Sequence, residues 1–217
     1  MKVVVSLGGS LLSLDNPEFI EKVSLLLKKI SDEISLFIVV GGGKTARNYI
    51  STGRKFCEDE RYLDEIGIAA TRLNAYLINS FFRKKIPLTI EEALQIGPPV
   101  VMGGTLPGHS TDAVAAMLAN EARADHLVIA TDVDGIYDKD PKIYGDAIKF
   151  DRISIDKLIE MVGEEWKMAG YKVVVDPVAC KIIRDGRIKT FVVNGRNLKE
   201  LENAIYSKEF NGTVIEV

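Results

Sequence analysis

The sequence predicts an α/β protein built around a mainly parallel sheet. Short β-branched runs alternate along the 217 residues with longer segments whose apolar residues recur at helical spacing. Several of the predicted strands end in glycine, and a helix follows each of these turns. In open α/β sheets, ligands bind at the carboxyl ends of the strands. The turns at residues 8–10, 41–44, 103–112 and 131–140 are therefore expected to line one site.

The elements follow in order along the first half of the chain. Residues 3–7 predict a buried strand that ends in glycine, and Asp15 or Asn16 can cap the next helix, with Pro17 in its first turn. Further predicted elements are a strand at 36–40, helices at 44–56 and 62–82, a short helix at 91–96 and a strand at 100–102.

The second half continues the alternation. Thr111 or Asp112 is expected to start a helix that runs to residue 122, and Asp112 is also a plausible N-cap. The remaining predictions are a strand at 126–130, helices at 151–162 and 177–183, a strand at 188–193, a helix at 198–206 and a strand at 213–217.

Composition excludes several classes of function. The net charge is −3, and no basic cluster carries stacking aromatic residues, so we expect no nucleic-acid partner. The longest apolar runs are far shorter than the roughly 20 residues of a membrane span, and the N-terminus lacks the pattern of a signal peptide. Cys57 and Cys180 lie far apart without metal-binding spacing. We interpret them as reduced thiols and expect a cytoplasmic protein without membrane contact.

Two glycine turns have the chemistry of phosphate sites. Gly8-Gly9-Ser10 and Gly41-Gly42-Gly43-Lys44 each present backbone N–H groups at a helix start, where the helix dipole favours anions. Lys44 and Arg47 stand in the first helical turn, where a cation costs up to about 1 kcal/mol unless an anion offsets it. The alternatives are tight turns without a ligand and ordinary solvated surface charge.

Two further loops are rich in polar groups. Residues 103–112 offer hydroxyls, backbone donors, His109 and the carboxylate of Asp112, so they suit a ligand, although His109 could equally fix only the turn. Residues 131–141 hold four carboxylates within nine residues, but their spacing fails the EF-hand pattern. No dedicated metal site is therefore expected.

The ordered set of motifs resembles the amino-acid-kinase family. The matching residues are Gly8-Gly9-Ser10, Gly41-Gly42-Gly43-Lys44 with Arg47, the run 104–112, and Thr131-Asp132-Val133-Asp134-Gly135-Ile136-Tyr137. Within the family, these residues look like the archaeal type of UMP kinase, and the resemblance runs from residue 2 to 217. It implies a three-layer αβα sandwich with a mostly parallel sheet, and transfer of the ATP γ-phosphoryl group to UMP.

The resemblance also implies cofactors, partners and a division of the chain. ATP and Mg²⁺ would be used, with the ion bridged mainly by the nucleotide rather than by protein ligands. The protein would be a homo-oligomer, hexameric in UMP kinases. One domain would span residues 1–217, with an acceptor-binding part at about 1–122 and an ATP-binding part at about 123–217.

Roles carry over from the family onto matching positions. Catalytic roles would fall to Asp112, to Asp176 and to Lys44. The ATP-binding residues would be Gly9, Ser10, Gly43, Arg47, Thr131, Asp132, Tyr137 and Asp140. The UMP-binding residues would be Gly42, Asp64, Thr105, Leu106, Pro107, Gly108, His109, Ser110 and Thr111, with Asp64 accepting the ribose hydroxyls.

Two departures from the family pattern matter. Many members carry a lysine where this chain has Ser6, which leaves Lys44 and Lys181 as candidate cations for the transferring group. Asp132 stands where asparagine is usual. Two other functions stay open: a same-fold kinase with another small acceptor, and a non-catalytic nucleotide-binding or storage protein.

Overall fold

The structure, a computed structural model, describes residues 1–163 and 174–217. Its centre is a seven-stranded sheet with the order β3-β2-β1-β4-β8-β9-β7. Neighbours from β3 to β8 run parallel, β9 runs antiparallel to β8, and β7 pairs parallel with β9. The strands are β1 (Lys2–Leu7), β2 (Ser35–Val40), β3 (Val100–Met102), β4 (His126–Thr131), β7 (Arg152–Ser154), β8 (Thr190–Asn194) and β9 (Gly212–Glu216). The mostly parallel sheet is confirmed.

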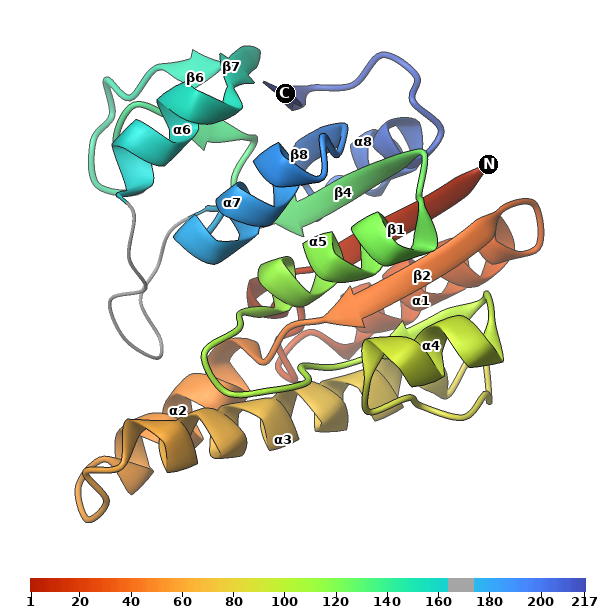
Figure 1. Cartoon of the computed structure of the whole chain (residues 1–217), viewed down its shortest axis with the longest axis vertical. Coiled ribbons are helices and arrows are strands. Elements are labelled where there is room, and N and C mark those ends of the chain that lie inside the picture. Colours follow the sequence, from red (N-terminus) through yellow and green to blue (C-terminus); the bar gives the residue numbers. More distant parts are fainter. Residues whose placement is uncertain (164–173) are drawn as a thin grey trace.

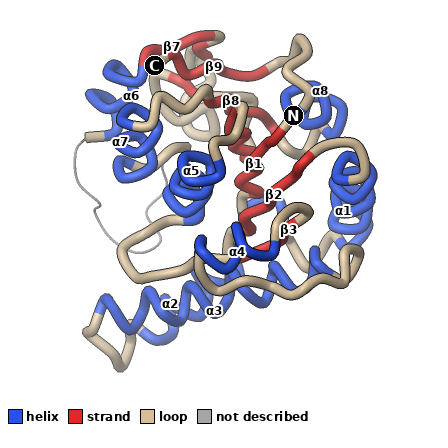
Figure 2. Tube along the Cα trace, turned by 45° about the vertical axis from the view of Figure 1, so that its right-hand side comes forward, coloured by secondary structure: helices blue, strands red, loops and turns tan. Residues whose placement is uncertain are grey.

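Helices cover both faces of the sheet, which confirms the three layers (Figures 1 and 2). One face carries α1 (Pro17–Ser31), α8 (Leu198–Ile205) and the C-terminal part of α3 (Glu60–Asn79). The other carries α4 (Ile90–Ile96), α5 (Thr111–Ala122) and α7 (Pro177–Asp185), with α6 (Ile155–Val162) packed beside α7. Alternate residues of β1 enter the two cores, Val4 on one side and Val3 and Val5 on the other. A strand buried on both faces is apolar throughout, as the sequence pattern indicated.

Helix α2 (Gly43–Gly53) lies against α3 rather than against the sheet (Figure 1). A small apolar cluster of Ala46, Ile50, Leu63 and Ala70 joins the two helices. They therefore form an arm beside the carboxyl end of β2, which α2 follows directly.

Several predicted boundaries were wrong, each for a local reason. The helix expected from 151 begins at Ile155, because residues 152–154 pair with β9 and the Ser154 side chain caps the helix. The helix expected from 62 begins at Glu60, because Asp59 accepts hydrogen bonds from the N–H groups of residues 61 and 62. A two-stranded hairpin, β5 (Ile136–Tyr137) with β6 (Lys149–Phe150), was not predicted at all.

Smaller shifts occur at four other ends. The helix expected at 44–56 ends at Gly53, and α3 ends at Asn79 instead of 82. The strand expected from 188 begins at Thr190, and α7 extends to Asp185. Asn16 caps α1 with Pro17 in the first turn, as expected.

The strand order places a crevice at the carboxyl ends of β1 and β4. From β1 the chain moves through α1 to β2 on one side, whereas β4, reached through α5, pairs with β1 on its other side. Such a reversal of direction leaves the strand ends open to a ligand. Within the described ranges, no helix has the length and apolar character needed to cross a membrane.

Candidate active site

The two glycine turns at the ends of β1 and β2 touch each other through their backbones. A Cβ atom on Gly9 would lie 2.1 Å from the Gly43 nitrogen, and one on Gly43 would lie 2.0 Å from the Gly9 oxygen. Gly43 also has a φ of +58°, in the left-handed region that glycine tolerates best. The structure therefore brings the two predicted phosphate turns together.

The helices that follow these turns lack side-chain caps. Gly42 at the start of α2 and Gly8 at the start of the 3-10 turn η1 (Gly9–Leu11) make no side-chain cap hydrogen bond. Each of the helices α1, α3, α4, α5, α6, α7 and α8 is capped by a side chain. Because uncapped first-turn N–H groups need an acceptor, these two starts are prepared for an anion.

Three residues on one stretch of α3 hold the turns in place, and sequence reasoning missed all of them. Asn74 is buried, and its Nδ2 donates to the carbonyl oxygens of Gly41 at 2.8 Å and Gly42 at 3.2 Å. Thr71 Oγ1 accepts from the Gly104 nitrogen at 2.7 Å. Arg72 donates from Nε to the Gly104 oxygen at 3.2 Å, and from an Nη to the carbonyl of residue 105 at 3.3 Å. This face of α3 thus sets the relative positions of the second glycine turn and the 104–111 loop.

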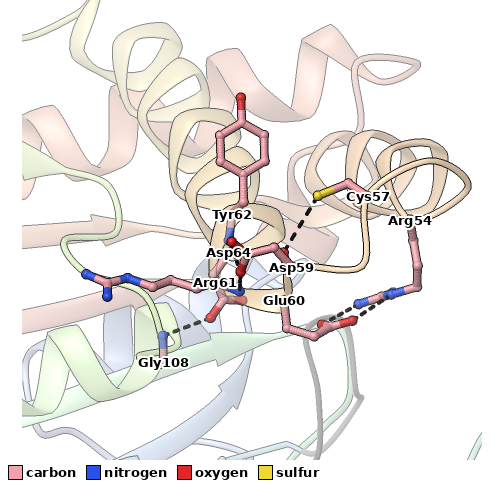
Figure 3. A network of polar contacts seen from close by, with 8 residues as sticks. All are labelled: Arg54, Cys57, Asp59, Glu60, Arg61, Tyr62, Asp64 and Gly108. Atoms are coloured by element: carbon pink, nitrogen blue, oxygen red, sulfur yellow. Dashed lines mark hydrogen bonds and ion pairs between the residues drawn. The ribbon is translucent and has the colours of Figure 1, made fainter.

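Asp64 reaches the same loop from the beginning of α3. Its Oδ2 accepts a hydrogen bond of 2.8 Å from the Gly108 nitrogen, and Figure 3 shows the side chain directed at that residue. Beside it, Arg54 forms a two-pronged ion pair with Glu60 across the α2–α3 turn. The predicted UMP-binding residues Asp64 and 105–111 are therefore brought together.

His109 in this loop has an unpartnered nitrogen. Its Nδ1 is buried and makes no hydrogen bond to any described residue. Buried polar atoms are rarely left unpaired, so an orphan in a loop is a reason to expect a ligand there. Leu106 is largely exposed, and Gly108 has a φ of +83° with open space around it.

Asp112 lies in the first turn of α5 and is not its cap, so that prediction was wrong. Ser110 is the cap: its hydroxyl accepts from the Ala113 nitrogen at 3.0 Å. Asp112 instead accepts a hydrogen bond of 2.5 Å from the hydroxyl of buried Ser6. Ser6, the position at which the family resemblance led us to expect a lysine, is thus in direct contact with this carboxyl group.

The environment of Asp112 favours its neutral form. Burial raises its pKa to about 7; the Ser6 hydrogen bond acts in the opposite direction, and the nearby charge of Asp176 adds to the increase. Burial and the two carboxyl groups also raise the pKa of the Cys180 thiol to about 12, so this cysteine stays protonated and packs as a core residue.

Asp176 connects the 104–111 loop to α7. Its Oδ1 caps α7 by accepting from the nitrogens of Val178 and Ala179, at 2.9 and 3.1 Å. Its Oδ2 accepts from the hydroxyl of Ser110. Sequence reasoning found Asp176 but not this capping role, which the pattern Asp-Pro before an apolar run could have indicated.

The predicted ATP loop follows β4. Asp132 forms an ion pair with the side-chain Nζ of Lys142 at 2.5 Å, and Asp140 accepts a hydrogen bond from the backbone nitrogen of Lys142 at 2.8 Å. Tyr137 lies in the β5–β6 hairpin, where burial and then Asp134 raise the pKa of its hydroxyl. Thr131 ends β4, and its carbonyl accepts from the Gly195 nitrogen at 2.8 Å. Of these residues, Thr131 is the one that the structure places beside the β1 turn, because the Gly8 nitrogen donates to the carbonyl of the preceding residue, Ala130.

The cationic side chains that were predicted to contact phosphate differ in their contacts and exposure. Lys44 makes a long, exposed contact of 3.5 Å with Asp15, and such pairs contribute little. Arg47 is half-buried in α2, and Lys181 is exposed on α7. Within residues 1–163 and 174–217, no group of three or more His, Cys, Asp or Glu side chains could hold a metal ion.

A sheet whose strand ends present two uncapped, touching glycine turns defines an anion-binding α/β protein. Residues 1–194 match the model of the amino acid kinase family. The chain belongs to this family.

Relatives and a solved structure match this chain over nearly its whole length. The uridylate kinase of Methanocaldococcus jannaschii is 46% identical over 227 residues, and that of Thermococcus kodakarensis is 43% identical over 225 residues. Both alignments cover 100% of each chain. The crystal structure of uridylate kinase from Archaeoglobus fulgidus superposes with a TM-score of 0.88 at 43% identity, covering 99% of this chain and 100% of that one.

Proposed function

We propose that this chain is a uridylate kinase, which transfers the γ-phosphoryl group of ATP to UMP and releases UDP and ADP. The observation that carries the substrate assignment is the full-length identity of 43–46% to uridylate kinases. The site supports the reaction, because two uncapped glycine turns in contact offer places for two phosphate groups that face each other.

The first task of the protein is to position the two phosphates. The backbone donors at Gly9, Ser10 and Gly43, together with Arg47, would hold the ATP phosphates, and Gly42 with the 105–111 loop would hold UMP. Asn74 fixes the carbonyls of the second turn, which orients its N–H groups. Holding the acceptor oxygen in line with the γ-phosphorus turns an encounter between two molecules into a local step.

The second task is to recognise UMP. One carboxylate oxygen of Asp64 accepts the hydrogen bond from the Gly108 nitrogen, so the other could accept one from a ribose hydroxyl. The free Nδ1 of His109 gives the same loop a further polar contact for the nucleotide. Thr131, Asp132, Tyr137 and Asp140 would bind the adenosine end of ATP.

The third task concerns charge at the reacting centre. Mg²⁺ would neutralise phosphate charge, held mainly by the nucleotide, because the ion keeps few protein ligands. Asp112, with Asp176 nearby, would orient the catalytic groups. Lys44 remains a candidate for contact with the transferring group. Residues 1–122 would form the acceptor part of one domain and residues 123–217 most of its ATP part.

We also propose a cytoplasmic homo-oligomer, with a hexamer as the expected state. Large apolar side chains are exposed along α2 and α3, which suits contact with a second copy. They are Tyr49 on α2 and Tyr62, Leu73, Tyr76 and Leu77 on α3. Light scattering at several concentrations measures the assembly, and a monomer at all of them contradicts it.

A coupled assay of ADP release tests the function. UMP, CMP, dTMP and glutamate are offered separately as acceptors, with and without Mg²⁺. Turnover that is much faster with UMP, and that needs Mg²⁺, is the expected result. Turnover with another acceptor alone indicates a different kinase, and nucleotide binding without turnover indicates a storage protein.

A further inference from the structure

Arg196 lies beside the first glycine turn and has no role in the site described so far. It follows β8 in the turn Asn194-Gly195-Arg196, at the same edge of the sheet as the other ligand loops. Its Nη2 donates to the carbonyl oxygen of Ser10 at 3.1 Å. A cation from the end of β8 thus reaches the turn at the end of β1.

The strand order places β4 beneath the turn that carries Arg196. β4 lies between β1 and β8 in the sheet, so their ends are separated by two strand spacings, about 10 Å. The turn that carries Arg196 bridges this gap over the carboxyl end of β4, where the Gly195 nitrogen donates to the Thr131 oxygen. That end carries Thr131 and Asp132, which are predicted to bind ATP.

The backbone of Arg196 is firmly positioned. The Gly195 nitrogen donates to the Thr131 oxygen at 2.8 Å, and the Arg196 nitrogen donates to Oδ1 of Asn194 at 3.0 Å. A Cβ atom on Gly195 would lie 2.4 Å from Leu11, so the turn packs directly against η1. Nδ2 of Asn194 is in turn held by Asp134 at 2.8 Å.

The charge of Arg196 is not neutralised by the parts of the protein that the structure describes. The side chain forms no ion pair with residues 1–163 or 174–217 and is exposed, and most of its N–H donors face no described acceptor. It also precedes the N-terminus of α8, which Asn197 caps, and a cation there is unfavourable with respect to the helix dipole. A bound anion would use these donors and offset the unfavourable interaction with the dipole.

We propose that Arg196 binds the phosphate chain of ATP and contributes the positive charge that Ser6 cannot supply. The inference rests on the proposed kinase function. Arg196 is tethered over the ATP side of the crevice, whereas the contact that Lys44 makes is long and solvent-exposed. A guanidinium is suited to this task, because its planar set of donors matches phosphate oxygens.

The test compares three variants of the full-length chain in the ADP-release assay. Arg196→Gln removes the charge, and Arg196→Lys keeps it without the planar fork. Lys199→Gln is the matched control, because it removes one positive charge three residues away, where Lys199 contacts Glu202 at 3.6 Å and is mostly exposed.

We expect the KM for ATP to rise about tenfold in Arg196→Gln, which corresponds to about 1.4 kcal/mol. The KM for UMP should stay within about twofold, and Arg196→Lys should recover part of the loss. Lys199→Gln should match the parent protein. The unfolding midpoint without ligand should not change in Arg196→Gln, whereas the increase that ATP produces in this midpoint should shrink.

Two results would overturn the proposal. One is an unchanged KM for ATP together with an unchanged ATP-induced shift of the unfolding midpoint. The other is an equal rise of both KM values with a lower midpoint without ligand, since Arg196 would then serve only to tie Ser10 in place. Failure of the kinase function itself looks different: the parent protein would show no turnover of UMP, and the ATP-induced shift would still test Arg196.

Discussion

Replacing Asp112 by asparagine tests the electrostatics of the site through protein stability. The carboxyl group has a pKa raised from 3.8 to about 7, chiefly by burial, so the folded protein prefers its neutral form. Asparagine keeps the shape, can still accept the 2.5 Å hydrogen bond from Ser6, and carries no charge at any pH. The variant should therefore mimic the protonated side chain.

The sign of the effect follows from the raised pKa. A carboxyl whose pKa is higher in the folded state binds its proton more tightly there, so its favourable contribution is complete only below the unfolded pKa of 3.8 and is lost as the pH rises from there through about 7. The displacement from 3.8 to about 7 corresponds to at most about 4 kcal/mol. Because Asp112 keeps partial exposure, we expect about half of this, about 2 kcal/mol, in favour of Asp112→Asn at about pH 9.

Urea unfolding of both proteins at about pH 5 and pH 9 measures the difference. At the lower pH the folded parent is neutral but its unfolded chain is already ionised, so the advantage of the variant should be clearly smaller than at pH 9 without disappearing. Kinase activity should fall in the variant at both pH values if Asp112 orients the reacting groups. A stability difference that is the same at both pH values would refute the reasoning, because it would have no electrostatic origin.

Three other substitutions probe separate parts of the site. Gly43→Ala should cost about 2–4 kcal/mol of unfolding free energy and most of the activity, because φ is +58° and the new Cβ would meet a carbonyl oxygen at 2.0 Å. Gly145→Ala, which meets open space, is its control in the same urea titration. Asn74→Leu leaves two carbonyl acceptors without their donor, so stability should fall by about 1–3 kcal/mol and the KM values for both nucleotides should rise; an unchanged unfolding curve would contradict this. Asp64→Ala should raise the KM for UMP about tenfold and leave that for ATP unchanged in steady-state assays, whereas equal effects on both would remove Asp64 from the acceptor site.

Much of the fold was readable because its signals are local. Buried parallel strands appear as short apolar runs, and glycine marks the turns that follow them, so β1, β2, β3 and β4 were placed to within a residue or so. The β5–β6 hairpin escaped because each of its strands has only two residues. Strand β7 escaped because its three residues depend on β9, some sixty positions later.

The site was predicted less completely, for a different physical reason. Thr71, Arg72 and Asn74 hold the loops that lie against α3. The helical pattern of the sequence does not indicate which loops these are. Polar residues on a helix ordinarily indicate a solvated face. The same limit applies to Ser110, whose hydroxyl caps α5 and also donates to Asp176.

The structure changes what the glycines themselves imply. Packing explains part of the requirement for glycine at positions 9 and 43, because any Cβ there would collide with the opposite turn. Glycine at these two positions would therefore be expected even if the turns only packed together and bound no ligand. The absence of side-chain caps on η1 and α2 carries the functional inference instead, since contact between the turns does not explain why these two helix starts lack them. A side-chain cap on either helix start would occupy the N–H groups that phosphate needs. Without a ligand, two uncapped starts are unfavourable, and a bound nucleotide would compensate by accepting hydrogen bonds from these N–H groups.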